Sequence, residues 1–366
     1  MFRKIQGWTL TKHRIYKITV WAIIILLLML AYPIGVLVLN IACDYKPPQA
    51  VIIDESNTYD TLNPGKSIEI LSWNIGYCGL SCDMDFFYDG GTKVRPEKEV
   101  FFENFIEIQD FLQADTSSHL ILLQEVDNGS KRSYGTKQFD NFWSLKHLDG
   151  YKAYHAPNYR VKFVPMPITT PMGKVESGLV TLSKFNPKSV VRRAYPSNER
   201  FPMRYFNLDR CAMVLRYQLS NGKELMLVNT HNSAFDDGSQ RKIEMEFLKM
   251  YIEREYAAGN FIVVGGDWNQ MPPGFEPQFR HDRFEAGYSL PVPADFTPKG
   301  WKWAFDNRTP TNRMVDKAYT KGNTGTTVID CFLVSPNITV DTVYCINLGF
   351  VHSDHNPVML KFRMAE

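Results

Sequence analysis

The 366-residue sequence has no segment that repeats at a fixed period and no strong excess of either charge. It carries 41 Lys and Arg residues against 39 Asp and Glu residues, a formal net charge of +2, and 44% of its residues are hydrophobic. The lack of repeats excludes a repeat architecture, and the ordinary apolar content excludes a disordered or collagen-like chain. We therefore expect a globular protein, with two domains or one large α/β domain.

Acidic residues are missing from the first 39 positions, which contain five basic residues. Setting these five aside leaves 36 basic and 39 acidic residues in the rest of the chain, a net charge of −3. A large nucleic-acid clamp needs a strongly basic surface, so this composition excludes one. A polyanionic substrate would have to be bound locally, with the help of a metal ion.

Several common catalytic signatures are also missing. The sequence contains no G-x-S-x-G, so a serine hydrolase would have no nucleophile elbow, and neither a Walker A motif nor H-E-x-x-H occurs. The six cysteines include one C-x3-C pair, Cys78 and Cys82, without a second pair at the spacing of a zinc site. These two could form a disulfide outside the cytoplasm or be small buried side chains.

One long apolar run lies near the N-terminus. Residues 18–39 carry no charge, and 22 helical residues at 1.5 Å each extend about 33 Å, enough to cross a bilayer core of about 30 Å. The run is longer than the apolar part of a signal peptide, although Cys43 leaves lipoprotein processing open. Five basic residues precede the run and only Lys46 follows within 20 residues, so the positive-inside rule places residues 1–17 in the cytoplasm. We expect a single-pass membrane protein with a tether at 40–66 and an extracytoplasmic domain at 67–366.

Short β-branched or aromatic runs, bounded by turn residues, predict strands in the rest of the chain. The runs are at 68–75, 119–125, 178–183, 211–219, 224–231, 260–267, 326–335 and 356–362. Apolar residues spaced by three and four predict helices at 96–112 and 240–258. This mixture predicts an α/β domain in which helices cover the faces of sheets.

Polar residues suited to metal binding or proton transfer stand at the ends of these predicted strands. They are Asn74, Glu125, His231, Asp267, Asn269, Asp330, Asp354 and His355. Taken singly, each has an ordinary structural explanation, such as a turn, a solvated carboxylate or a buried histidine. Because residues at strand ends meet at one edge of an α/β sheet, their occurrence together predicts a site there.

The same residues lie in motifs that resemble the endonuclease/exonuclease/phosphatase superfamily, which includes DNase I-like nucleases, inositol-polyphosphate phosphatases and bacterial sphingomyelinases. The motifs are LSWNIG (71–76), LLQEVD (122–127), VNTH (228–231), GGDWNQ (265–270), IDCFLVS (329–335) and SDHNPV (353–358). They stand in family order, and the resemblance covers about residues 67–363. It implies a four-layer α/β sandwich, with two packed, mostly antiparallel sheets flanked by helices and an active site at one edge.

The resemblance makes Glu125 the principal ligand of a metal ion. A carboxylate is a hard oxygen ligand that suits Mg²⁺ or Mn²⁺. Asn74 is expected to add a neutral oxygen, and Asp354 to hold a metal-bound water. Few protein ligands are needed because Mg²⁺ keeps several waters.

His355 is expected to be the general base, since histidine can accept a proton from water near neutral pH. The family assigns its orienting carboxylate to the position of Asp330. Asp267 and Asn269 are two apart on a segment expected to be extended, and would point the same way. By resemblance, Asn269 and His231 would donate to phosphoryl oxygens, whereas Asp267 would either protonate the leaving oxygen or position the water.

These roles predict a Mg²⁺-dependent phosphoesterase that hydrolyses phosphodiester bonds by in-line attack of a water activated by histidine. A nuclease is the first expectation for its substrate class. A sphingomyelinase, a phospholipase C-like enzyme or an inositol-phosphate phosphatase is the alternative, because the membrane helix would bring lipid head groups within reach. The aromatic stretch 300–305 could then contact the bilayer or form a packed loop. A catalytically inactive binding domain is the remaining alternative, and no protein partner is indicated.

Overall fold

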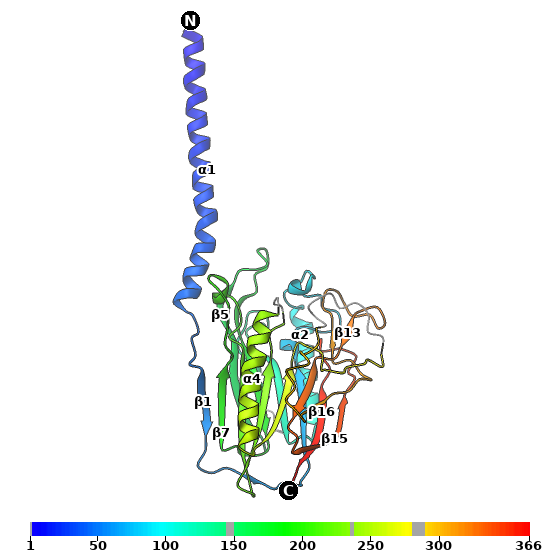
Figure 1. Ribbon diagram of the computed structural model, residues 1–366. Helices are drawn as coiled ribbons and strands as arrows, with labels where there is room; N and C mark the ends of the chain where they lie inside the picture. Colours follow the sequence, from blue (N-terminus) through cyan, green and yellow to red (C-terminus); the bar gives the residue numbers. More distant parts are fainter. Residues whose placement is uncertain (1, 144–149, 235–237, 280–289) are drawn as a thin grey trace.

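The N-terminal apolar segment belongs to one long helix, α1 (Phe2–Ala42), which projects from the rest of the molecule (Figure 1). Residues His13–Ala42 are long and apolar enough to cross a membrane, and they include the predicted span. The structure, a computed structural model, describes residues 2–143, 150–234, 238–279 and 290–366. Met1 of the predicted N-terminal segment lies outside the described residues.

Two large sheets form within these described ranges. The first has the strand order β1 (Ala50–Glu55), β7 (Ser189–Ala194), β8 (Cys211–Leu219), β9 (Glu224–His231), β10 (Phe261–Asp267), β14 (Asp330–Val334), β11 (Lys302–Ala304), with β2 (Thr61–Leu62) also paired to β8. The second has the order β15 (Ile338–Cys345), β16 (Val358–Met364), β3 (Ile68–Asn74), β4 (Leu120–Asp127), β6 (Gly173–Ser183), β5 (Lys152–Val164). A small pair joins β12 (Asn312–Arg313) to β13 (Thr326–Thr327).

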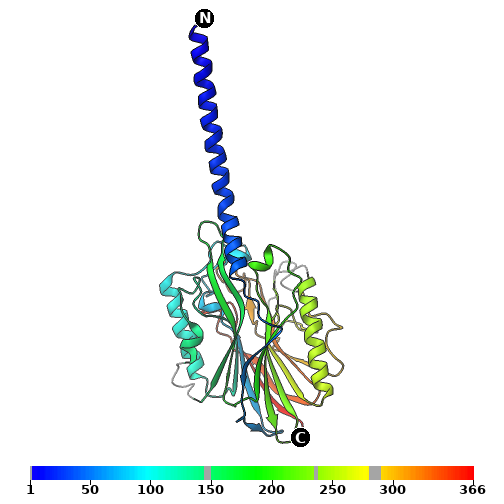
Figure 2. The ribbon, with the colours of Figure 1, turned by 90° about the vertical axis from the view of Figure 1, so that its left-hand side faces the viewer.

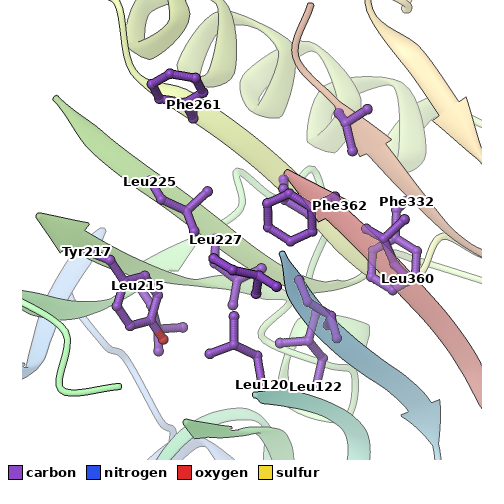
Figure 3. Packing of buried hydrophobic residues seen from close by; sticks show 14 of the residues in the cluster. Leu120, Leu122, Leu215, Tyr217, Leu225, Leu227, Phe261, Phe332, Leu360 and Phe362 are labelled. Carbon is purple, nitrogen blue, oxygen red and sulfur yellow. The ribbon is translucent and has the colours of Figure 1, made fainter. Parts of the chain in front are cut away.

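The core lies between the two sheets. Buried side chains from β4 and β16 meet those from β9 and β14, including Leu122, Phe362, Leu227 and Phe332 (Figure 3). Helix α2 (Lys98–Ala114) packs on the outer face of the second sheet, and α4 (Ser239–Ala257) packs on the outer face of the first. Figure 2 shows these two helices on opposite sides of the sandwich. The four-layer α/β sandwich predicted from the sequence is confirmed.

The eight apolar runs all contain strands, with boundaries shifted by a few residues, and the run at 326–335 divides into β13 and β14. Both predicted helices are present. Strands β5, β7 and β15, and the short helix α3 (Gln138–Trp143), were not among the predicted elements. Strands β5 and β7 alternate buried residues with less buried ones, and β15 is exposed or half-buried except at its two ends, so a search for apolar runs misses them.

The segment expected to be a tether, residues 40–66, contains regular secondary structure. Its run AVIIDE forms β1, which pairs with β7 at the edge of the first sheet, because β-branched residues favour a pleated, half-buried strand. The aromatic stretch at 300–305 is a packed segment: Trp301 is 7% exposed, and Trp303 contacts Trp268 edge-to-face. All six cysteines are free thiols, so the disulfide considered between Cys78 and Cys82 does not form.

Candidate active site

Strand register places three of the predicted residues side by side on the first sheet. In β10, Asp267 pairs with His231 of the parallel strand β9 and with Asp330 of the antiparallel strand β14. On the second sheet, Asn74 is the last residue of β3, and its Nδ2 atom donates to Asp267 Oδ2 at 3.0 Å. The ends of the two sheets therefore meet, and residues distant in the sequence share one edge.

Glu125 reaches this edge because β4 is irregular there. The pairing of β4 with β6 shifts between residues 123 and 126, and Glu125 has a positive φ of 55°. The preceding side chain, Gln124, turns into the core and donates to Asn229 Oδ1 at 2.8 Å. A bulge re-aims a side chain, and here it brings Glu125 Oε1 to 3.3 Å from Asn74 Nδ2, which donates to it.

Two glycines permit the close approach of these segments. Gly266 has a φ of 137°, and a Cβ at this position would lie 2.0 Å from the carbonyl oxygen of Thr230. Gly76 has a φ of 49°, and a Cβ there would lie 2.7 Å from Asp354 Oδ1. A side chain at Gly266 would push apart the backbones of β10 and β9, and one at Gly76 would displace the carboxylate of Asp354.

His355 is held at both ring nitrogens. Its Nδ1 lies 2.8 Å from Asp330 Oδ2, so the structure brings together the predicted histidine and its orienting carboxylate. Its Nε2 lies 2.9 Å from Asn312 Nδ2, and the indole of Trp73 donates to its backbone oxygen at 2.9 Å. A neutral imidazole with its proton on Nδ1 would donate to Asp330 and accept from Asn312.

His231 lies beside the carboxylate of Asp267. Its Nε2 is 3.4 Å from Asp267 Oδ2 and 4.0 Å from Glu125 Oε1. Burial, followed by the charges of Arg210 and His355, holds the pKa of His231 well below its usual value. The imidazole is therefore neutral at pH 7 and can donate one hydrogen bond into the cluster.

Two predicted arrangements differ from what the structure shows. The Oδ1 atom of Asn74 accepts from the backbone N–H of Gly76 at 3.0 Å, so its amide presents nitrogen rather than the expected ligand oxygen to the carboxylates. Asn269 has a φ of 51°, and the segment is a turn rather than extended, because Asp267 Oδ1 accepts its backbone N–H at 2.8 Å. The side chain of Asn269 donates to the carbonyl of Asn232.

Buried charge is concentrated around His355. Burial, reinforced by Asp330 and opposed by His355, raises the pKa of Asp267 to about 7. Burial and Glu125, again opposed by His355, raise the pKa of Asp354 to about 7. Burial alone would lower the pKa of His355, but Asp330, Asp354 and Asp267 raise it to about 10. The hydrogen bonds of His355 with Asp330 and Asn312 suit a neutral imidazole. The negative charge of the surrounding carboxylates favours the protonated imidazolium instead.

The donor set fits a hard divalent cation. Glu125 and Asp354 both line the same cavity, and carboxylate oxygens are the ligands that Mg²⁺ and Mn²⁺ prefer. Asp330 Oδ1 is buried without a hydrogen-bond partner among the described residues. Ligand atoms of Asp267, Asp330 and His355 also lie within 4.8 Å of one another, but the hydrogen bond from His355 already engages Asp330. A positive ion near Glu125 and Asp354 would relieve the excess of negative charge.

This charge balance predicts that a divalent cation stabilises the protein more at high pH. Without a cation, the stability contributed by the raised pKa values of Asp267 and Asp354 is lost as the pH rises from about 4 to 7, and that of His355 from about 6.5 to 10. We expect 10 mM Mg²⁺ to raise the Tm by about 5 °C at pH 8 and by about 1 °C at pH 5.5. Thermal denaturation followed by circular dichroism measures both shifts, and equal shifts would contradict the assignment.

Residues that sequence reasoning missed complete the cluster. Asn312 comes from a loop-rich segment and bridges to His355. Arg210 is half-buried and donates to the carbonyl of His231 at 3.2 Å. Neither of these residues stands in a motif or at the end of a predicted strand, so no signal in the sequence marked them.

Comparisons with known proteins identify the family and the fold of the chain. A model of the endonuclease/exonuclease/phosphatase family matches residues 71–355. A protein from Beutenbergia cavernae described as an endonuclease/exonuclease/phosphatase is similar in structure, with 16% identity and a TM-score of 0.52, over 82% of this chain and 72% of that chain. A protein of the same family from Leptotrichia buccalis has 11% identity and a TM-score of 0.50, over 81% and 100%.

A conserved protein of unknown function from Enterococcus faecalis gives 13% identity and a TM-score of 0.50, over 81% and 100% of the two chains. At this identity, the structural similarity shows the fold alone. No curated protein sequence matches the chain significantly. The family match spans most of the chain and contains every member of the cluster from Asn74 to His355, and the protein belongs to the endonuclease/exonuclease/phosphatase family.

Proposed function

We propose that the protein hydrolyses phosphodiester bonds with the help of a divalent cation, Mg²⁺ or Mn²⁺. Members of the family are phosphoric-ester hydrolases. One observation supports this reaction most: Glu125, Asp354 and His355 line one cavity, and His355 is hydrogen-bonded to the buried carboxylate of Asp330. An inactive binding domain would have no need to keep a buried, charged cluster of this kind, because unpaired buried charge destabilises the fold.

Each residue has a chemical task in this proposal. Glu125 and Asp354 hold the cation, which when bound would neutralise the phosphoryl charge and offset the carboxylates that raise the pKa of His355. His355 Nε2 accepts the proton of the attacking water once its hydrogen bond with Asn312 opens, and Asp330 fixes the orientation of the ring. His231 donates to a non-bridging phosphoryl oxygen. Asp267, through its raised pKa of about 7, can exchange a proton with the leaving oxygen near neutral pH.

Asn74 and Asn269 act around this centre. Asn74 donates to Glu125 and Asp267 and so keeps both carboxylates in position. One N–H of the Asn269 amide is engaged by Asn232, which leaves the other for a phosphoryl oxygen. The proposal also includes the membrane topology. The charge asymmetry around the apolar run supports a cytoplasmic basic segment at 1–17, a membrane span within α1 and a catalytic domain outside the cytoplasm.

Removal of divalent cations tests the proposed reaction. We expect the full-length protein in detergent to hydrolyse bis(4-nitrophenyl) phosphate, and EDTA followed by desalting to lower the rate at least about 100-fold. Added Mg²⁺ or Mn²⁺ should restore the rate, whereas added Na⁺ at equal ionic strength should not. Absorbance of released nitrophenolate measures the turnover. Full activity after chelation would exclude a cation-dependent mechanism.

A further inference from the structure

We infer that the substrate is a phosphoester of a membrane lipid, which reaches the catalytic centre from the side of the bilayer. This inference rests on the proposed function and names its substrate class. It follows from where α1 is fastened, from an apolar rim beside α1, and from a cavity lined by residues of the rim and by His355.

Helix α1 is fastened directly to the catalytic domain. The side chain of Asn40 makes two hydrogen bonds with the backbone of Phe163 at the end of β5, at 2.9 and 3.1 Å. Val36, one turn earlier, is buried against the domain although it belongs to the apolar span. The helix also contacts the 3-10 turn η4 (Met203–Tyr205). With α1 in a bilayer, β5 and η4 would therefore lie at the membrane surface.

Exposed apolar side chains stand at this level. The loop between β5 and β6 carries Ile168, 76% exposed, and Met166, and the segment at η4 carries Phe201, 67% exposed, and Met203. The loop tip between β5 and β6 rises beside the lower part of α1 (Figure 1). Apolar side chains of this kind bind the interfacial region of a bilayer. We call Met166, Ile168, Phe201 and Met203 the apolar rim.

A cavity of about 840 Å³ is lined both by Met166 and Met203 of the apolar rim and by Glu125 and His355 of the catalytic centre. Tyr45, shortly after the end of α1, also lines it. Met172 and Phe206 contribute apolar walls. A volume of this size with apolar walls accommodates a lipid head group and the start of its acyl chains.

Three residues that line the cavity each have a buried polar atom without a hydrogen-bond partner among the described residues: Asn158 Nδ2, Ser177 Oγ and Arg192 Nη1. The residues are 2%, 3% and 1% exposed. Ser177 pairs with Asp127 of β4, two positions after Glu125, and Arg192 Nε donates to the carbonyl of Pro157. Because unsatisfied buried donors are costly, this cluster is suited to bind oxygen atoms of a head group beside the catalytic centre.

The charges at the cavity disfavour a long nucleic acid. Asp44, Asp89, Glu199 and Asp209 line it together with the basic residues, and Arg204 is already near Asp44, at 3.5 Å. A nucleic acid would bring a row of phosphates past these carboxylates, whereas a single lipid presents one phosphoryl group. In the reaction, the oxygen of water forms a new P–O bond, one P–O ester bond of the lipid breaks, and the leaving oxygen receives a proton.

The test reconstitutes the full chain into vesicles of phosphatidylcholine, phosphatidylethanolamine, phosphatidylglycerol and sphingomyelin in equal parts, with Mg²⁺. We expect release of head-group products, detected by mass spectrometry. The double variant Ile168→Asp, Phe201→Asp should lower this release at least about tenfold and leave turnover of soluble bis(4-nitrophenyl) phosphate unchanged. The matched control Ile106→Asp alters an exposed apolar residue on α2, away from the apolar rim, and should change neither rate. Ser177→Ala should raise the half-saturating lipid fraction about tenfold.

The outcomes separate the two proposals. Cleavage of the soluble diester without lipid turnover would overturn the lipid inference and leave the proposed function standing. Cleavage of a single-stranded oligodeoxynucleotide with a higher kcat/KM than any vesicle lipid would assign the substrate to nucleic acids instead. If no phosphodiester is cleaved under any condition, both proposals fail. Equal loss of lipid turnover in Ile106→Asp and in the double variant would also contradict a specific role for the apolar rim.

Discussion

Replacement of His355 by alanine should lower kcat for bis(4-nitrophenyl) phosphate by about 10³-fold and change KM little. The imidazole is fixed by Asp330 on one nitrogen and lies 2.9 Å from Asn312 on the other, so its position is determined before substrate binds. Alanine removes the proton acceptor and leaves Asp330 buried without its partner. Steady-state kinetics at saturating Mg²⁺ measures the loss.

The control for this variant is His352→Ala. His352 lies three residues earlier and bonds to Asn104 rather than to the catalytic cluster, so we expect its removal to change kcat less than about twofold. Both variants should be checked for folding by circular dichroism, since His355 is buried. Because Asp330→Asn keeps the ring in place with a weaker partner, it should lose less activity than His355→Ala. Turnover of folded His355→Ala at the wild-type rate would remove this residue from the mechanism.

Replacement of Glu125 by glutamine should also lower kcat by about 10³-fold at 1 mM Mg²⁺, with partial recovery at 50 mM. Glutamine keeps the size of the side chain and its contact with Asn74 but removes the negative charge that attracts the cation. The bulge in β4 directs the side chain of Glu125 into the cavity, whereas its neighbour Gln124 points into the core and donates to Asn229. The midpoint of a Mg²⁺ titration of activity should move to a higher concentration.

Glu107→Gln is the matched control for the charge change. Glu107 is exposed on α2 and lies outside the cavity, so its variant should keep the wild-type Mg²⁺ midpoint. A Glu125→Gln protein with an unchanged midpoint and lowered kcat would show that Glu125 acts in the reaction without holding the cation. An unchanged kcat would remove it from the site.

The sequence was sufficient to predict which residues meet, because strand ends converge and strand register is regular. Asp267, His231 and Asp330 occupy paired positions on neighbouring strands, and such pairing follows from the fold class. The same reasoning failed for Asn269, where the expected extended segment is a turn held by the side chain of Asp267. Local hydrogen bonds from Asp side chains compete with extended structure, and the strand pattern alone does not indicate which will form.

Asn312, the second partner of His355, and the shape of the cavity could not be predicted from the sequence, for a different reason. Asn312 lies in a segment without periodic apolar residues, and long-range contacts, including its bridge to His355 and its pairing with Thr327, bring it to the site. The apolar rim and the cluster of Asn158, Ser177 and Arg192 depend on β5 and β7, whose alternating residues gave no apolar run. Long-range contacts between such strands are properties of the folded chain rather than of any short stretch.

The two hydrogen bonds between Asn40 and the backbone of Phe163 have a consequence for how such an enzyme would search for its substrate. A flexible linker between the membrane helix and the catalytic domain would let the active site move away from the bilayer and reach molecules on neighbouring vesicles. A fixed connection keeps the active site at a constant distance from the bilayer, so encounters with substrate would depend on lateral diffusion in two dimensions. The rate would then follow the mole fraction of the lipid in the protein's own membrane, and not its bulk concentration.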